Sequence, residues 1–303
     1  MRHIALSGLL AACLAVPALA EDVTIDTAQG AVTLPAQPAR IAAYDVAAID
    51  SLHALGADPV AVPDNIFISY LSDIAASATK VGTLFEPDLE ALAGVGPDLI
   101  VVGGRSATQR DSVAQVATAI DMTIGPDLVQ DAKARITAYG TLLGKEAEAE
   151  ALNASIDDKL AEVAAAGEGK GSALIVLTNG PKLSAYGEGS RFGWILDVAG
   201  LTDVASEFRP KEGEEVASHG NSISHEFIAE HNPDWLIVLD RGAAIGEDGP
   251  SAQTTLSNPL VEGTTAWKEG QVIYLSPAVL YIGAGGYQGL TSLLDELIAG
   301  LKG

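Results

Sequence analysis

One long segment in the middle of the chain contains no residue that breaks a helix. Residues 145–166 lack glycine and proline and are rich in Ala, Glu, Leu and Lys, which favour helices. They predict one continuous helix of about 22 residues, or about 33 Å at 1.5 Å per residue. The glycine-rich run 167–171 then ends it. Such a helix at mid-chain, with an α/β segment on each side, predicts a rigid connection between two lobes.

Short apolar runs alternate with helical segments on both sides of this helix. Runs without polar alternation indicate strands that are covered on both faces. They lie at residues 40–44, 99–102, 173–177, 236–239 and 272–275. Strands that alternate with helices are typical of an α/β fold with largely parallel sheets. We therefore expect two Rossmann-like α/β lobes, at residues 21–144 and 168–303, joined by a linking helix at 145–167.

The first 20 residues have the pattern of an export signal. Arg2 and His3 form a short polar start, residues 4–16 are mostly apolar, and Ala18-Leu19-Ala20 gives a small-x-small cleavage site before Glu21. The apolar run is too short to span a bilayer. We expect residues 1–20 to be a signal peptide and the mature protein to be soluble in the periplasm.

The single cysteine, Cys13, lies inside this segment. It follows Leu10-Ala11-Ala12, which resembles a lipoprotein cleavage box, so a lipid tether at Cys13 is the alternative to cleavage after Ala20. Cleavage after Ala20 is favoured because cleavage before Cys13 would leave an unusually short signal. A mature chain without cysteine has no disulfide, no thiolate metal site and no thiol nucleophile.

The formal net charge of −23 restricts the partners of this protein. So acidic a chain lacks the basic footprint of a nucleic-acid-binding protein and would be repelled by anionic lipid. An anionic ligand remains possible, because a few arginines in one cleft can dominate the local potential. The chain has no Gly-x-Ser-x-Gly motif and no zinc-type histidine spacing. We expect a monomeric binding protein with no catalytic residue and no intrinsic cofactor.

The two halves of the chain repeat one pattern. Residues 89–105 and 226–241 each contain a short helical segment, Pro-Asp, a buried strand, and an arginine eight residues after the proline, Arg105 and Arg241. Ligands of open α/β sheets bind beyond the carboxyl ends of the strands, so both arginines are predicted to face one cleft. A glycine-rich loop, residues 184–193, places Arg191 beside a helix N-terminus, which favours anions.

Two further loops carry candidate ligand contacts. His219 lies in the polar run 218–224, and Tyr281 precedes a glycine-rich turn that lets backbone approach a ligand closely. The residues alone leave both assignments open, since a loop histidine is often merely solvated and Tyr281 could equally be a core residue.

These motifs together resemble the periplasmic binding proteins of iron–siderophore ABC importers, whose two lobes are joined by one helix. The resemblance covers essentially all of the mature chain and is closest to the catecholate- and petrobactin-type siderophore binders. The matching segments are Val81-Gly82 with Glu86-Pro87-Asp88, Pro97 to Arg105, Ser184 to Gly193, Ser218-His219-Gly220, Asn232-Pro233-Asp234 with Asp240-Arg241, and Tyr281 before Gly285-Gly286.

The resemblance implies a function and a site. Arg105, Arg191 and Arg241 would hold an anionic ferric siderophore, and the iron would arrive as part of that ligand. His219 and Tyr281 would complete the iron shell when the siderophore supplies only four donor atoms.

The resemblance also implies a protein partner, the membrane permease of the importer. One surface glutamate on each lobe would dock onto it, and Glu90 and Glu226 match best, with Glu86 the runner-up in the first lobe. Two alternatives to siderophore binding stay open: a binder of another metal chelate, such as haem or a corrinoid, and an enzyme on the same two-lobed fold.

Overall fold

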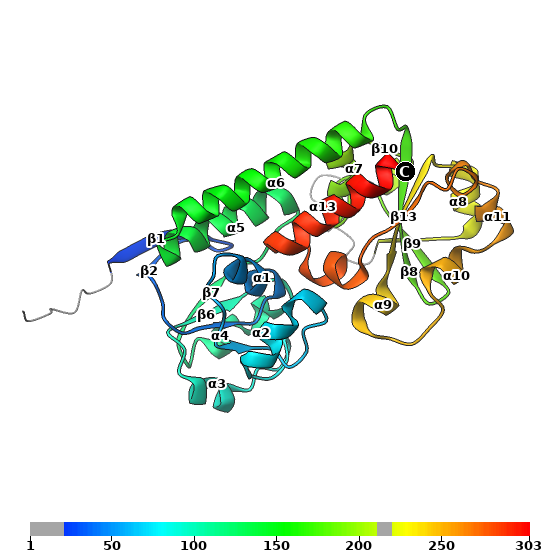
Figure 1. Ribbon diagram of the computed structural model, residues 1–303. Coiled ribbons are helices and arrows are strands. Elements are labelled where there is room, and N and C mark those ends of the chain that lie inside the picture. Colours follow the sequence, from blue (N-terminus) through cyan, green and yellow to red (C-terminus); the bar gives the residue numbers. More distant parts are fainter. Residues whose placement is uncertain (1–20, 211–219) are drawn as a thin grey trace, which may run out of the picture.

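The computed structural model describes residues 21–210 and 220–303, which form two α/β lobes beside one another (Figure 1). Helix α6, Glu146–Gly167, runs along both lobes and confirms the long helix predicted at residues 145–166. The two-lobed α/β fold is likewise confirmed. The predicted signal at residues 1–20 and His219 lie outside the described residues.

The first lobe is built on a five-stranded, fully parallel sheet in the order β5-β4-β3-β6-β7. Its strands are β3 (Ile41–Ala43), β4 (Ala61–Val62), β5 (Thr79–Lys80), β6 (Leu99–Val102) and β7 (Thr118–Asp121). All four residues of β6 are buried, as its unbroken apolar sequence predicts. The helices of this lobe are α1 (Val46–Ala54), α2 (Ser72–Ser77), α3 (Leu89–Val95), α4 (Arg110–Val113) and α5 (Leu128–Leu143). An antiparallel hairpin, β1 (Asp22–Thr27) and β2 (Gly30–Pro35), precedes them.

The second lobe has a mixed sheet in the order β11-β9-β8-β12-β13, with β10 paired to β8. Its strands are β8 (Ser172–Asn179), β9 (Lys182–Tyr186), β10 (Thr202–Asp203), β11 (Asn221–Ile223), β12 (Trp235–Asp240) and β13 (Val272–Tyr274). Its helices are α7 (Trp194–Ala199), α8 (His225–His231), α9 (Arg241–Ile245), α10 (Ala252–Leu256), α11 (Pro259–Glu262), α12 (Thr265–Lys268) and α13 (Tyr287–Lys302).

Two segments expected as loops contain strands of this sheet. The first residues of the glycine-rich loop 184–193 belong to β9, which runs antiparallel to β8, and residues 221–223 form β11 against β9. The reason is a tight hairpin between β8 and β9, where Gly180 adopts a φ of 55° that suits glycine. The prediction of largely parallel sheets holds for β8, β10, β12 and β13.

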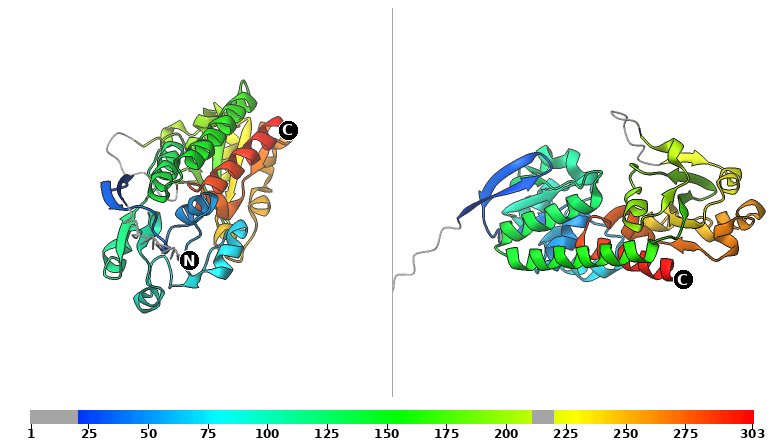
Figure 2. Two further views of the ribbon diagram at one scale, coloured as in Figure 1. Left: turned by 60° about the vertical axis from the view of Figure 1, so that its left-hand side comes forward. Right: turned by 90° about the horizontal axis from the view of Figure 1, so that it is seen from above.

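The C-terminal helix gives the lobes a second connection. Helix α13 lies beside α6 (Figures 1 and 2). Lys159 of α6 forms an ion pair with Asp295 of α13. Asp50 of α1, fully buried, accepts hydrogen bonds from the backbone N–H groups of Gln288 and Gly289, at 2.9 and 2.8 Å. The first turn of α13, reached from the second lobe, is therefore anchored on the first lobe.

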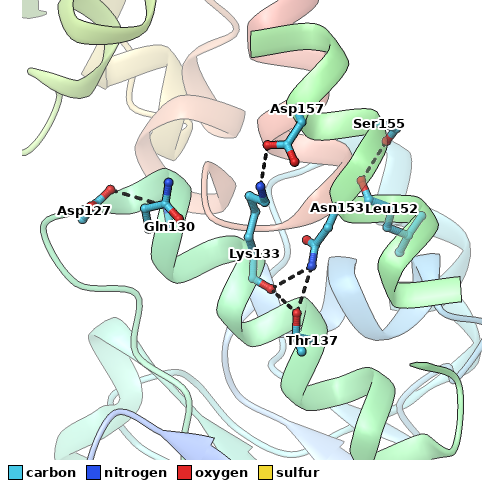
Figure 3. A network of polar contacts seen from close by, with 8 residues as sticks. All are labelled: Asp127, Gln130, Lys133, Thr137, Leu152, Asn153, Ser155 and Asp157. Atoms are coloured by element: carbon cyan, nitrogen blue, oxygen red, sulfur yellow. Dashed lines mark hydrogen bonds and ion pairs between the residues drawn. The ribbon is translucent and has the colours of Figure 1, made fainter. Parts of the chain in front are cut away.

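Helices α5 and α6 are joined by polar contacts (Figure 3). Lys133 of α5 pairs with Asp157 of α6, and the Asn153 side-chain amide donates to the Lys133 carbonyl and to the Thr137 hydroxyl at 3.2 and 2.9 Å. At the other end of α6, a Cβ on Gly167 would lie 1.9 Å from the carbonyl oxygen of Ala199, so only glycine lets α7 pack there. These contacts fix α6 against both lobes.

We expect the lobes to move little when ligand binds. A continuous helix lacks the soft loop hinges that absorb large backbone rotations, and α13 braces the same junction. X-ray scattering curves of ligand-free and ligand-saturated protein should nearly superimpose. A large decrease in the radius of gyration on binding would contradict this prediction.

Candidate ligand-binding site

A cavity of about 440 Å³ lies between the lobes, with walls from both. The first lobe contributes the residues that follow β3, β6 and β7, and the second contributes the loop before α7 and the short π-helical turn Val279–Gly283. The cavity therefore lies at the carboxyl edge of the first parallel sheet, the place where ligands bind in such sheets. Its walls combine apolar side chains, among them Ile124, Leu128 and Leu280, with Arg105, Arg191 and Tyr281.

Tyr281 is the centre of an arginine cluster. Tyr281 is 5% exposed, and the guanidinium carbons of Arg191, Arg105 and Arg241 lie 4.6, 4.9 and 5.8 Å from the centroid of its ring. Arg191 and Arg105 donate to the Tyr281 carbonyl oxygen over 2.6 and 3.3 Å, and Arg241 Nε donates to the phenol oxygen over 3.3 Å. One backbone carbonyl and one aromatic ring thus hold three cations that come from both lobes.

Each arginine is placed by the end of a strand or by a loop. Arg105 follows β6 in the short 3₁₀ turn Gly104–Gln109, and Arg241 is the first residue of α9, directly after β12. Asp240 fixes the start of α9, because its carboxylate accepts from the backbone N–H of Ala243 at 3.0 Å and of Ala252 at 2.8 Å. Arg241 also donates to Asn179 at 3.3 Å. The repeated strand–arginine pattern therefore brings one cation from each lobe to the cluster.

The cluster changes the acidity of its members. Burial and the neighbouring charge of Arg191 lower the pKa of the Arg105 guanidinium. Burial alone would raise the pKa of the Tyr281 phenol, but the hydrogen bond from Arg241 and the charges of the three arginines outweigh it, so this pKa lies below the ordinary value. The cavity therefore carries excess positive charge and a phenol that ionises unusually readily, which suits an oxygen-rich anion.

The structure brings together four of the five ligand-binding residues named from the sequence: Arg105, Arg191, Arg241 and Tyr281. The fifth, His219, lies outside the described residues. Within the described residues no group of three or more His, Cys, Asp and Glu side chains is arranged to hold a metal ion. Of the described side chains, Tyr281 is the one in the arginine cluster that could offer an anionic oxygen to iron.

The two glutamates predicted to dock on a permease lie on the surface and do not line the cavity. Glu90 and Glu226 are each the second residue of a helix, α3 and α8, and both are exposed. Both helices start at the carboxyl edge of their sheets: α3 follows β5, and α8 follows β11, whose Ile223 lies level with the end of β8. They share this edge with Arg105 and Arg241.

Sequence reasoning missed Asp45, which also lines the cavity. It follows β3 and caps α1, accepting from the Ala48 backbone N–H at 2.8 Å. The sequence pattern that could have identified Asp45 is the one that identified Arg105 and Arg241, a charged residue directly after a buried strand. Phe192 was also missed. It is almost fully buried and packs against Tyr186 in a tilted arrangement, with ring centroids 4.7 Å apart and an angle of 60° between the rings. The guanidinium group of Arg191 lies over the Phe192 ring.

Comparison with known proteins agrees with this geometry. The family model described as "Periplasmic binding protein" matches residues 41–279, most of the chain. The chain belongs to this family. Its members are substrate-binding proteins, the class that the sequence predicts. No helix in the described part of the chain is long and apolar enough to cross a membrane.

Several relatives are similar over nearly their whole length. The petrobactin-binding protein YclQ of Bacillus subtilis is 31% identical over 89% of this chain and 84% of its own length, and its crystal structure superimposes with a TM-score of 0.84 over 93% and 99% of the two chains. The ferric-anguibactin-binding protein FatB of Vibrio anguillarum is 28% identical over 94% of this chain and 89% of its own length. The catecholate-siderophore binding protein VctP of Vibrio cholerae is 29% identical, with a TM-score of 0.82 over 93% and 99%.

Proposed function

We propose that this protein captures a ferric siderophore of the catecholate type in the cleft between its lobes and delivers it to the membrane permease of an ABC importer. The observation that carries the proposal is the cluster of Arg105, Arg191 and Arg241 around Tyr281, at a cavity of about 440 Å³. The relatives named above bind petrobactin, ferric anguibactin and a catecholate siderophore, which supports the same ligand class.

The chemistry of the cluster fits a ferric catecholate. Fe³⁺ is a hard cation that prefers oxygen donors, and its catecholate complexes carry net negative charge that guanidinium groups can neutralise. Guanidinium groups donate charge-assisted hydrogen bonds to such oxygens, and these are about twice as strong as bonds between neutral groups. Arg105 and Arg191 now donate to a neutral carbonyl oxygen, so an anionic ligand offers them stronger acceptors.

Tyr281 and His219 are proposed as iron ligands for siderophores that leave two of the six coordination positions open. Tyrosine binds ferric iron as phenolate, and the lowered pKa of Tyr281 favours that form. The proposal for His219 rests on the family resemblance, with a neutral ring nitrogen as the donor.

Intrinsic fluorescence tests the ligand class. Trp194, Trp235 and Trp267 report on bound chelates, and Trp194 lies in the helix that directly follows the Arg191 loop. Ferric bis- and tris-catecholates should quench this fluorescence saturably and at much lower concentration than ferric hydroxamates, haem or cobalamin. Tighter binding of haem or cobalamin than of any ferric siderophore would contradict the proposal and favour the alternative chelates.

We also propose that Glu90 and Glu226 dock the loaded protein onto basic residues of the permease. Charge reversal of both, E90K/E226K, should abolish siderophore-dependent iron uptake in cells while the purified variant binds ferric catecholate normally. The matched control is E150K/E269K, which reverses two other exposed glutamates of α6 and the α12 C-terminus. Equal uptake by both double variants would remove Glu90 and Glu226 from the interface.

Export is the last part of the proposed function. We propose that residues 1–20 direct the chain to the periplasm and are removed, that the mature chain is a monomer of lobes 21–144 and 168–303 joined by residues 145–167, and that iron enters only with the ligand. Mass spectrometry of the protein from the native host should give the mass of a chain that starts at Glu21. A mass corresponding to a chain that starts at a lipid-modified Cys13 would show a membrane tether instead.

A further inference from the structure

An acidic side chain faces the otherwise cationic cleft. Among the described residues that line the cavity, Asp45 is the one carboxylate, and it shares the cavity wall with Arg105 and Arg191. Its place after β3 puts it at the same sheet edge as Arg105, because β3 and β6 are adjacent and parallel. A carboxylate beside a site for an anionic complex repels that complex unless the ligand brings a group to offset its charge.

The surroundings of Asp45 hold it in place and give it no ion pair among the described residues. Oδ1 accepts the backbone N–H of Ala48 at 2.8 Å, which fixes the carboxylate at the start of α1. Glycines face its other oxygen: a Cβ on Gly103 or Gly104 would lie 3.2 or 3.7 Å from Oδ2. Within the described part of the chain, no lysine or arginine forms an ion pair with Asp45.

The neighbouring cation is directed elsewhere. Arg105 donates to the Tyr281 carbonyl at 3.3 Å and lies over the Tyr281 ring, so it attracts Asp45 through its charge without forming an ion pair with it. The cavity wall is therefore bipolar, with the guanidinium groups of Arg105 and Arg191 at Tyr281 and one carboxylate, that of Asp45, against the Gly103–Gly104 backbone. Burial and the charge of Asp121 raise the pKa of Asp45 to about 6, while backbone hydrogen bonds and the charge of Arg105 oppose the shift. A cationic group of a ligand would favour the ionised carboxylate.

A ligand that fills this cavity removes water from Asp45. If the nearby part of the ligand is neutral or anionic, the ionised carboxylate loses hydration without gaining a partner, which is costly in a protein interior. If that part carries a protonated amine, the carboxylate gains a charge-assisted hydrogen bond in place of water. Asp45 therefore discriminates between ligands mainly by penalising those that leave it unpaired.

We propose that Asp45 binds a protonated amine of the ligand, so that the preferred cargo is a ferric catecholate whose backbone carries an ammonium group. This proposal rests on the proposed function of the arginine cluster. It gives the Asp45 side of the same cavity the role of binding the ligand's amine. The ligand is thereby oriented, with its iron–catecholate part toward Tyr281 and its amine toward Gly103 and Gly104.

The test compares two ferric complexes that differ at one atom. Both are bis(2,3-dihydroxybenzamide) chelators with linkers of equal length; one linker contains a secondary amine and the other has CH₂ at that position. Native protein should bind the amine complex about tenfold or more tightly at pH 7.5, the range expected for one charge-assisted hydrogen bond. In D45N this preference should vanish. Asparagine is as good an N-cap as aspartate, so α1 keeps its start.

The control is D73N, which removes one negative charge from an exposed residue of α2 in the same lobe and should keep the native preference. A native protein that binds both complexes equally well, or a D45N variant that keeps the preference, would overturn the assignment of Asp45 and leave the catecholate-binding function standing. Failure of the native protein to bind either complex would overturn both.

Discussion

The double variant R105Q/R191Q should bind ferric catecholates about 100-fold more weakly than the native protein. Each guanidinium would donate charge-assisted hydrogen bonds to the anionic complex, and the loss of one such bond costs about 1.5–3 kcal/mol, or about 10- to 100-fold in affinity. Because both arginines share the Tyr281 carbonyl as an acceptor, their effects will not simply add. Titration of intrinsic fluorescence measures the loss.

Two controls separate this effect from general damage. Arg110 is a surface arginine paired with Asp111, so R110Q removes the same charge at a distance from the cavity and should bind normally. The thermal midpoint of R105Q/R191Q should not fall, because Arg105 and Arg191 repel each other and Arg105 is unfavourably buried, as its lowered pKa indicates. Undiminished affinity in the double variant would show that these arginines do not contact the ligand.

Much of the fold could be predicted because its signals are local. The helix α6 follows from 22 consecutive residues without a helix breaker, and β6 follows from four apolar residues between Pro-Asp and glycine. The strands β9 and β11 were missed because a polar, glycine-containing sequence gives no strand signal; their pairing depends on the hairpin at Gly180 and on β8 beside them. The packing of α13 on α1 was also missed, since it depends on Asp50, which lies more than 230 residues earlier in the chain.

In the candidate site, too, features set by local sequence could be predicted, and features set by contacts between distant segments could not. Arg105 and Arg241 could be predicted because the carboxyl ends of parallel strands gather at one edge of a sheet. The burial of Tyr281 among the arginines could not, because it depends on how the turn Val279–Gly283 meets the first lobe. A Cβ on Gly283 would lie 2.4 Å from Cδ1 of Ile68, so this glycine permits the close contact. The sequence indicates that a glycine-rich turn follows Tyr281, but not which surface it meets.

The variant Y281F should separate siderophores by the number of donor atoms they offer. A ferric bis-catecholate fills four of the six iron positions, so the Tyr281 phenolate can take a fifth, whereas a tris-catecholate leaves none open. Y281F should therefore weaken binding of the bis-catecholate about tenfold or more, the range for one strong polar interaction, and leave the tris-catecholate almost unaffected. The catecholate-to-iron absorption band of the bound bis-catecholate should also shift. H219A, proposed from the family resemblance, should show the same selectivity.

The pH dependence of the catecholate-to-iron absorption band tests whether the arginines lower the pKa of the Tyr281 phenol. Burial raises the pKa of Tyr281, but the hydrogen bond from Arg241 and the three guanidinium charges lower it further than burial raises it. Since the phenol must lose its proton to bind iron, a lower pKa lets iron–phenolate coordination persist to lower pH. R241Q removes the hydrogen bond to the phenol oxygen, so the pKa should rise and the band of the bis-catecholate complex should appear only at higher pH. The tris-catecholate complex provides the control, because its spectrum should not depend on Arg241.

Equal losses for both ligands in Y281F, with an unchanged spectrum, would show that the phenol does not touch iron and that Tyr281 serves only to gather the arginines.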